Sequence, residues 1–402
     1  MTNKIDIAII GPETLPIPPI RGGGIQTSIW ETVKKFKKYK AVVYSGTSTK
    51  DTKKEPLCSK YGPHLFKRIL RHDIESHLIR LRHLQFNNYF SYVYKIVKDI
   101  NQIRPSIIHI HSRCWFLAYL KKLLNYRPKI ILQHHNHYFT DMKDKQVNYY
   151  LKMIDAFVGV SNFTIKKEIL NRFPIYSNKC FTIYNGVNLD KFKPKWQYQK
   201  EEVDNIKNKL QIPTQSKIIT FVGRLSKQKG VLQLLIACKK LFVDYPDWNL
   251  VIAGSSWFGK NIENDFVKQL QKTSSTIENK IIFTGYIPHE KLPDLYAISD
   301  IFCAPSIMEE PFGLVFVEAQ ACGLPVLTSN RGGIPEIITE KTGIMIDNPE
   351  DPFQIFSQLK YLIDDPQKRL KISKIARSRI EQYFSWGNSA MQTEKLYDKI
   401  LG

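Results

Sequence analysis

Two carboxylates are spaced so that they could serve one binding site. Glu310 lies in a loop after an expected short strand, residues 301–304, and Glu318 comes eight positions later in an expected helix, residues 313–322. A strand at 326–328 follows, so the segment predicts a βαβ unit. In open parallel sheets, ligands bind at the carboxyl ends of the strands, where both carboxylates would lie.

The start of this helix is expected to attract an anion. The first amides of a helix have no acceptor within the helix and favour phosphate; here they belong to Gly313, Leu314 and Val315. An anion-binding centre between carboxylates, which accept hydrogen bonds from hydroxyl groups, suits a nucleotide joined to a sugar. The alternative is a capped helix that presents Glu318 to solvent.

A loop rich in cations follows another expected strand, which begins at Lys217. Arg224, Lys227 and Lys229 lie in this loop, and a helix at 231–242 comes next. At the carboxyl end of a parallel strand, Arg224 could neutralise a diphosphate through its planar guanidinium, and Lys229 could do so as a point charge. For any one lysine, a solvated loop is the alternative.

Glycines and histidines mark the strand ends of the first half of the chain. A glycine run joins a strand at 5–10 to a helix at 25–38, where the backbone could approach a phosphate closely. Histidines close the strands that begin at Ser106 and Lys129, and they could contact a sugar, bind zinc or be satisfied loop residues. Without a carboxylate motif of metal spacing, zinc is the least favoured of the three. These residues are Gly22, Gly23, Gly24, His109, His111, His134, His135 and His137.

Composition limits the class of protein. A chain of 402 residues exceeds one usual core, so two domains are expected. No run of about 18 apolar residues occurs, so no spanning helix is expected, and the first residues resemble a strand more than a signal peptide. The six cysteines are dispersed, which favours a reducing cytoplasm. We therefore expect a cytoplasmic protein, with peripheral attachment to the inner face of the membrane left open.

The net charge of +22 implies an anionic partner, such as nucleic acid, an acidic membrane surface or an acidic glycan. The densest basic cluster spans residues 50–82, where apolar side chains alternate with the charges. Such a segment could lie on a membrane or frame an anionic acceptor. The marks of a nucleic-acid-binding protein, such as a zinc finger or a recognition-helix signature, are missing.

Strands and helices alternate in both halves, which predicts an α/β protein with two doubly wound domains facing each other across a cleft. We place the boundary in the Asn-Gly turn at 185–188. Residues 1–188 would form the first domain, joined by a C-terminal helix at 387–402 that crosses back to it. Residues 189–386 would form the second domain.

The motifs together resemble the retaining glycosyltransferases of family four. The resemblance rests on Gly22-Gly23, Asn-Gly-Val-Asn at 185–188, the Gly-Arg-Leu motif with Lys229-Gly230, and the spacing from Glu310 to Glu318 before Ala-x-Ala-x-Gly-x-Pro-Val. It implies the GT-B fold, with the sugar donor held mainly by the second domain and the acceptor mainly by the first. Pro311 after the acid, the duplicate acid Glu309 and Gln26 after the glycines depart from the common pattern.

The resemblance also implies residue roles. Arg224 and Lys229 would hold the donor diphosphate, Glu318 the ribose, Glu310 the sugar hydroxyls, and His135, in preference to His134, would face the donor sugar. The further substrate-binding residues would be Gly22, Gly23, His111, His134, Asn136, Gly223, Gly285, Pro311, Phe312, Gly313, Leu314 and Val315. No Asp-x-Asp metal motif is evident, so neither a metal nor another cofactor is expected.

The reaction implied is transfer of a hexose or N-acetylglucosamine from a nucleotide sugar, with UDP the expected nucleotide. Lipopolysaccharide core or capsule would suit a basic first domain as acceptor. A nucleotide-sugar epimerase or a glycogen-synthase-like enzyme could use the same fold. A basic nucleic-acid-binding protein is the alternative from another class.

Overall fold

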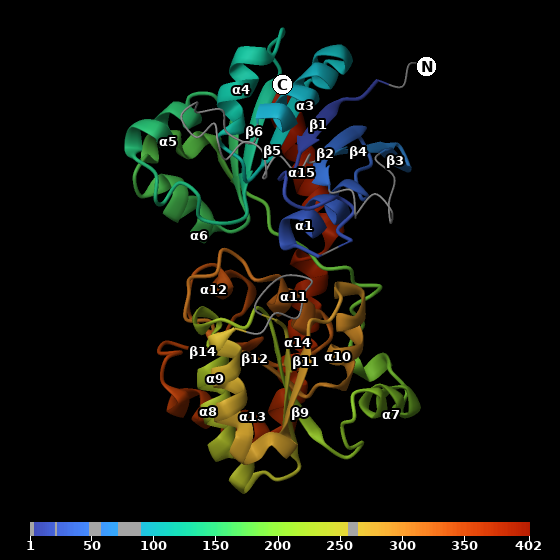
Figure 1. The fold of residues 1–402 in the computed structure, drawn as a ribbon, viewed down its shortest axis with the longest axis vertical. Coiled ribbons are helices and arrows are strands. Elements are labelled where there is room, and N and C mark those ends of the chain that lie inside the picture. The colour runs from blue at the N-terminus through green and yellow to red at the C-terminus, as the bar shows by residue number, and fades with distance from the viewer. Residues whose placement is uncertain (1–3, 21, 48–57, 71–89, 256–263) are drawn as a thin grey trace. The chain divides into compact units, whose positions relative to one another are not determined.

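The computed structural model describes residues 4–20, 22–47, 58–70, 90–255 and 264–402 (Figure 1). The chain divides into two compact units. The N-terminal unit comprises Met1–Asn185 with Trp386–Gly402, and the C-terminal unit comprises Gly186–Ser385. None of the described helices is both long and apolar enough to cross a bilayer.

The N-terminal unit is a doubly wound sheet in the strand order β3-β4-β2-β1-β5-β6-β7-β8. All described pairs are parallel except β3 with β4. Its elements are β1 (Ile7–Ile10), α1 (Gly24–Val33), β2 (Ala41–Thr47), β3 (Cys58–Tyr61), β4 (His64–Leu70), α3 (Phe90–Ile103), β5 (Ile107–His111), α4 (Phe116–Leu123), β6 (Lys129–His134), α5 (Asp144–Leu151), β7 (Ala156–Gly159), α6 (Asn162–Ile165), β8 (Cys180–Thr182) and α15 (Trp386–Leu401).

The C-terminal unit is a parallel sheet in the order β11-β10-β9-β12-β13-β14. Helices α8, α9 and α13 pack together on one side, and α11 packs with α14 on the other (Figure 1). Its elements are α7 (Lys200–Lys209), β9 (Lys217–Val222), α8 (Val231–Asp244), β10 (Trp248–Ala253), α9 (Asp265–Ser274), β11 (Ile281–Gly285), α10 (Leu292–Ile298), β12 (Ile301–Ala304), α11 (Leu314–Ala321), β13 (Val326–Ser329), α12 (Ile334–Ile337), β14 (Gly343–Ile346), α13 (Pro352–Asp364) and α14 (Pro366–Tyr383).

Both units have the parallel, doubly wound architecture that the alternating pattern predicts, so the expected fold class is confirmed. The apolar runs of β1, β5 and β9 are buried on both faces, as is typical of parallel strands covered by helices. The predicted βαβ unit around Glu318 is present as β12-α11-β13. Gly323 follows α11 with a φ of 72°, which is the left-handed geometry of a helix end.

The first helix ends earlier than the periodicity predicts. α1 stops at Val33 instead of Lys38, and Phe36 turns into the core beside it. The carboxylate of Glu394 on α15 accepts the backbone amides of Lys37 and Lys38 at 2.9 and 2.7 Å. Figure 1 shows the red α15 beside the blue α1. A tertiary acceptor for these amides therefore replaces the last turn of the predicted helix.

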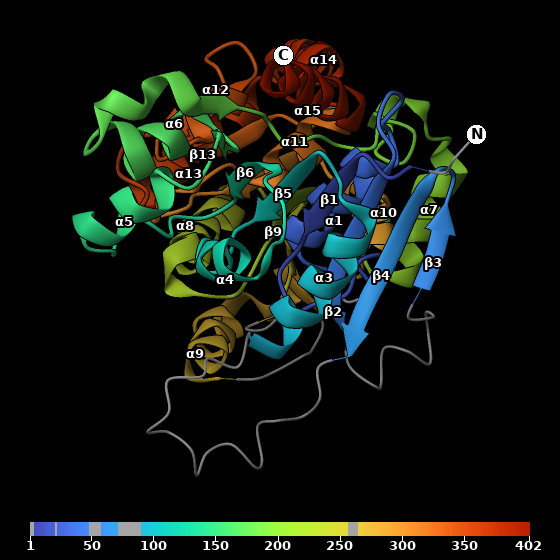
Figure 2. The same ribbon diagram turned by 90° about the horizontal axis from the view of Figure 1, so that it is seen from above.

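The basic segment at 50–82 is described only between residues 58 and 70; its remainder lies outside the described residues. The described part forms the edge hairpin β3-β4, which Figure 2 shows side by side. Phe66 is buried in the core, Arg68 Nε donates to the Ile17 carbonyl at 2.9 Å, and Lys67 pairs with Asp99 at 2.6 Å. Leu65, Phe66 and Ile69 of this hairpin pack against the core of the unit. Contact of the basic segment with a membrane or with an anionic acceptor stays a prediction.

Candidate functional site

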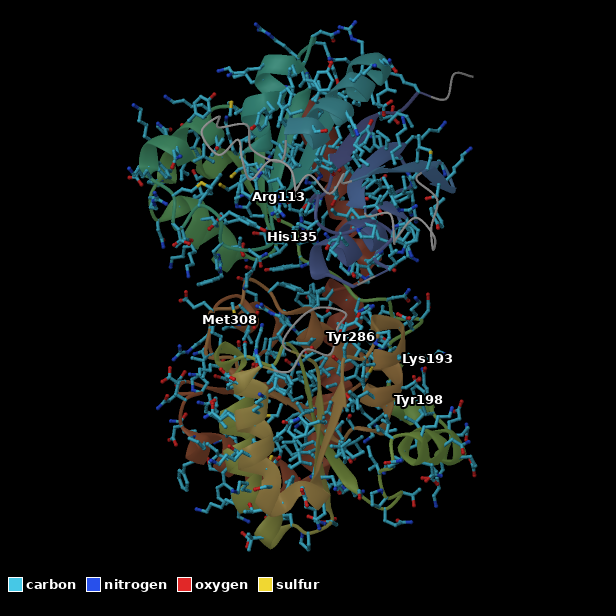
Figure 3. All side chains as sticks on the ribbon, viewed as in Figure 1. Arg113, His135, Lys193, Tyr198, Tyr286 and Met308 are labelled. Atoms are coloured by element: carbon cyan, nitrogen blue, oxygen red, sulfur yellow. The ribbon has the colours of Figure 1, made fainter. Side chains whose placement is uncertain are left out.

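The predicted binding residues of the C-terminal unit lie where its strand order reverses direction. β9 and β12 are parallel neighbours at the centre of the sheet, and the chain leaves them toward opposite edges. The loop after β9 carries Arg224 and Lys229, and the loop after β12 carries Glu310. Ligands of doubly wound folds bind at this switch point. In Figure 3, the labelled Tyr286 and Met308 follow β11 and β12 at this end of the sheet.

Lys229 and Glu310 are joined in the structure. The Lys229 ammonium donates to Oε1 of Glu310, and the same oxygen accepts from Ser306 Oγ at 2.9 Å. Lys229 ends a short 3-10 turn, after which Gly230 has a φ of 69° and lies against the backbone of Pro305. A Cβ at Gly230 would come within 2.0 Å of the Pro305 carbonyl oxygen, so only glycine allows the two loops to approach this closely.

The two neighbouring acids occupy different environments. The side chain of Glu310 is buried, whereas that of Glu309 is exposed. The Glu310 carbonyl accepts the Gly333 amide at 2.7 Å, and a Cβ on Gly332 would meet that carbonyl oxygen at 2.3 Å. The loop after β13 therefore fixes the backbone of Glu310 from one side while Lys229 holds its carboxylate from the other.

The amino end of α11 offers backbone donors beside this pair. Gly313 caps the helix with a φ of 98° and no side-chain hydrogen bond. Within the described residues, no acceptor is found for the amides of Gly313, Leu314 and Val315. Phe312, one of the predicted binding residues, has its side chain buried against Phe384, so only its backbone could reach a ligand.

Glu318 is held by two residues that the sequence did not single out. His289 Nε2 donates to its Oε1 at 2.7 Å, and the Tyr296 hydroxyl donates to its Oε2 at 3.2 Å. The ring of His289 also lies 5.5 Å from that of Phe192. Glu318 is buried while His289 is partly exposed. In the sequence, the only signal for His289 was its position shortly after the expected strand that ends at Gly285.

Three glycines lie at neighbouring strand ends in this unit. The Gly223 amide donates to Ala253, and the Gly254 amide donates to Gly285. A Cβ on Gly254 would come within 1.8 Å of the Gly223 carbonyl oxygen. Gly254, which sequence reasoning missed, therefore contacts both of the predicted binding residues Gly223 and Gly285.

The N-terminal unit gathers polar residues at its own switch point, between β1 and β5. Arg113, just past β5, donates to the carboxylate of Glu13, in the loop after β1, at 2.8 and 3.2 Å. Figure 3 shows Arg113 and His135 at the same end of this sheet. Gly22 and Gly23 precede α1 with φ values of 74° and 107°, both in the region that favours glycine.

The structure separates the two adjacent histidines that the sequence left as alternatives. His134 is fully buried and donates through Nδ1 to Glu168 Oε2 at 2.7 Å, while its contact with substrate stays a prediction. His135 turns the other way, with its Nε2 2.9 Å from Nδ1 of His111. Asn136, the next residue, is exposed.

Glu168 stabilises the loop that carries these residues. It lies in a single π-helical turn, Lys166–Leu170, and accepts the backbone amides of Tyr138 and Phe139 at 3.0 and 2.9 Å. Burial alone would raise the pKa of Glu168, but the hydrogen bonds from His134 and the loop amides bring it below its ordinary value. The folded state therefore favours the ionised carboxylate.

We expect Glu168→Gln to lower the stability of the protein by about 3 kcal/mol, because it removes a buried carboxylate that accepts several hydrogen bonds. This corresponds to a fall of roughly 6–12 °C in melting temperature. Because the folded pKa is depressed, the contribution of Glu168 is complete above its unfolded value of about 4.3 and is lost as the pH falls below it. As the pH falls below about 5, the stability of the variant should therefore decrease less steeply than that of the wild type.

Thermal melts at several pH values test this prediction. Asp144→Asn is the control, since its carboxylate pairs with Arg172 nearby but is mostly exposed, and we expect a loss below about 1 kcal/mol. Equal losses in the two variants, or an unchanged pH dependence, would contradict the role given to Glu168.

Within the described residues, no group of three or more His, Cys, Asp or Glu side chains is arranged to bind a metal ion. At the switch point of the C-terminal unit, the positive groups of the chain are basic side chains and the amides that open α11. Arg224 is exposed at the end of β9, and Lys227 lies exposed in the turn beside Lys229.

Two family models match the chain. Residues 202–379 match the family described as Glycosyl transferases group 1, and residues 22–191 match Glycosyltransferase Family 4. Spore coat protein SA of Bacillus subtilis (strain 168) is 31% identical over 398 residues, which span 98% of this chain and 99% of that protein.

Solved structures share the fold. A glycosyltransferase from Rickettsia africae ESF-5 superimposes with a TM-score of 0.80 at 24% identity, covering 100% of this chain and 99% of that one. Anabaena Alr3699/HepE in complex with UDP-glucose gives a TM-score of 0.75 at 19% identity, covering 98% and 99%. The fold and the matched families define a glycosyltransferase of the GT-B class. The chain belongs to glycosyltransferase family 4 and is a nucleotide-sugar-dependent enzyme.

Proposed function

We propose that this enzyme transfers a hexose or N-acetylglucosamine from a UDP-sugar to a cell-surface glycan, such as lipopolysaccharide core or capsule, with retention of anomeric configuration. The observation that carries the proposal is the group at the C-terminal switch point: Lys229 bound to Glu310, Arg224 in the same loop as Lys229, and the amides that open α11. The UDP-glucose held by HepE, which shares the fold, supports the choice of nucleotide.

Each residue has a proposed role in donor binding. Arg224 and Lys229 neutralise the diphosphate, and the amides of Gly313 and Leu314 complete its hydrogen bonds. Glu318 accepts the ribose hydroxyls. His289 and Tyr296 hold the two oxygens of Glu318 in place and leave lone pairs that can accept the ribose hydroxyls.

Further residues complete the proposed site. Glu310 accepts hydroxyls of the transferred sugar. In the N-terminal unit, His135 is the residue proposed to contact a sugar. Backbone at Gly22, Gly23, Gly223 and Gly285 admits the donor closely, and Asn136 and the backbone of Pro311 line the approach. Because Phe312 is buried, it contributes only main-chain atoms.

The proposed chemistry needs no protein nucleophile. As the bond between the sugar C1 and the diphosphate oxygen breaks, an oxygen of the leaving diphosphate takes the proton of the incoming acceptor hydroxyl. The new C1–O bond then forms on the same face. Arg224, Lys229 and the α11 amides stabilise the negative charge that grows on the diphosphate, which is the main catalytic effect. We therefore propose that the reaction proceeds without a divalent metal.

The distribution of charge favours an anionic acceptor on the N-terminal unit. Met1–Asn185 and Trp386–Gly402 hold 33 Lys and Arg against 14 Asp and Glu, a net charge of +19. Gly186–Ser385 holds 26 against 23, a net charge of +3. Most of the charge therefore lies outside the unit proposed to bind the nucleotide, and it would attract a phosphorylated or acidic glycan, or the membrane that carries it.

Ligand-induced stabilisation tests the donor assignment. With UDP at a hundred times its Kd we expect stabilisation by about 2.7 kcal/mol, a shift of roughly 5–10 °C, and smaller shifts with GDP and ADP. The measurements are made in EDTA, and transfer is then assayed in EDTA with UDP-glucose and UDP-N-acetylglucosamine. A larger shift with GDP or ADP would overturn the choice of nucleotide, and transfer that required added metal would overturn the proposed chemistry.

A further inference from the structure

The N-terminal unit contains a row of three buried histidines that ends at the proposed sugar-binding residue. His109 and His111 lie on one face of β5, with ring centroids 4.5 Å apart and planes inclined by 28°. His111 in turn contacts His135, which follows β6. At the far end, the Tyr397 hydroxyl of α15 lies 2.9 Å from Nδ1 of His109. The row thus connects three elements of the unit.

The contact between His111 and His135 has the geometry of a hydrogen bond in the plane of both rings. Their centroids are 5.2 Å apart and their planes differ by only 22°. The line between the nitrogens, Nδ1 of His111 and Nε2 of His135, measures 2.9 Å. A ring nitrogen lies about 1.1 Å from the centroid of its ring, so the N–N distance plus two such lengths accounts for nearly the whole distance between the centroids. The two nitrogens therefore lie close to the line that joins the centroids, and the N–H of one ring points at the lone pair of the other.

Both rings are neutral in this environment. Burial lowers the pKa of His135 to about 3, with a smaller effect from the other histidines, and burial together with His109 and His135 places the pKa of His111 well below its ordinary value. Two neutral imidazoles that share a hydrogen bond hold a single proton between them. If His111 donates through Nδ1, His135 carries its proton on Nδ1. If His135 donates through Nε2, His111 carries its proton on Nε2, so the tautomers of the two rings are coupled.

We propose that His111 is a positioning residue for His135: the hydrogen bond at its Nδ1 couples the tautomer of His135 to that of His111 and fixes the orientation of the His135 ring. This replaces the direct contact with substrate that the sequence suggested for His111, and it rests on the proposed role of His135. The remaining nitrogen of His135, Nδ1, is left to face the sugar, and the tautomer of His111 determines whether it donates or accepts. His109 packs on the ring of His111 and limits its movement.

Two substitutions at His111 separate positioning from packing. His111→Phe keeps a ring but removes Nδ1, and His111→Asn places an amide where Nδ1 was. We expect His111→Phe to lower kcat about 10- to 100-fold, as loss of an outer partner or a small misplacement does. Donor KM should change little, and His111→Asn should regain most of the lost kcat. His64→Phe is the control. His64 is also buried and accepts the Ala41 amide at 3.3 Å, but it lies in β4, outside the row of three histidines.

Nitrogen-15 spectra of the histidine rings give a readout that does not depend on activity. In the wild type, we expect one protonated and one bare nitrogen for His135, and in His111→Phe the averaged signals of exchanging tautomers. Unchanged His135 signals, or equal kcat in the two His111 variants after correction for stability, would overturn the proposal. His135→Ala distinguishes the two levels: wild-type kcat in that variant would refute the role of His135 itself, whereas a large loss there without a loss in His111→Phe would refute only the positioning by His111.

Discussion

Replacing Arg224 by alanine is expected to lower kcat by about 10²- to 10³-fold, the cost of removing one donor that stabilises a developing anion. Arg224 follows β9 and is exposed, in the loop that also carries Lys229. Its planar donors suit two diphosphate oxygens at once, so Arg224→Lys should recover only part of the loss. Steady-state kinetics with saturating acceptor measure the effect.

The matched control for Arg224 is Lys227→Ala. Lys227 is exposed in the same loop, and we expect its removal to change kcat by less than about threefold, since single exposed charges contribute little. Near-normal turnover of Arg224→Ala would show that the proposed diphosphate site is wrong. Equal losses in both variants would indicate a general effect of loop charge and not a defined contact.

The second large effect is expected at Glu310. Glu310→Gln should reduce kcat/KM about 10- to 150-fold, the equivalent of the 1.5–3 kcal/mol that hydrogen bonds to charged groups contribute. The substitution removes the charge that Lys229 contacts and weakens acceptance of sugar hydroxyls. Because Lys229 and Glu310 contact each other, the double variant with Lys229→Ala should lose less than the sum of the two single losses.

The adjacent acid is the natural control for this experiment. Glu309→Gln changes the same functional group one position away, on an exposed side chain, and should leave kcat/KM within about twofold. If Glu309→Gln were the damaging substitution and Glu310→Gln were tolerated, the register of the carboxylate pair would be wrong by one residue. Additive losses in the double variant would argue that Lys229 and Glu310 act independently.

Strand positions were predictable because parallel strands are buried on both faces. The runs that became β5, β9 and β10 stand out as short apolar stretches with turn residues at their ends. The end of α1 was not predictable, since it depends on Glu394, which lies more than 350 residues away in sequence. The packing of residues 58–70 was not predictable for a similar reason, because a pattern of basic and apolar residues does not show which side faces the core.

The sequence by itself determined the doubly wound class, the spacing of Glu310 and Glu318 and the cations after β9, because periodicity and short-range motifs are local properties of the chain. Only the tertiary structure decided that Glu310, not Glu309, meets Lys229 and that His289 and Tyr296 hold Glu318. The same holds for the separation of His134, bound to Glu168, from His135, bound to His111. Each of these choices depends on a partner that packing brings from another element, and buried polar groups select their orientation by the partners available to them.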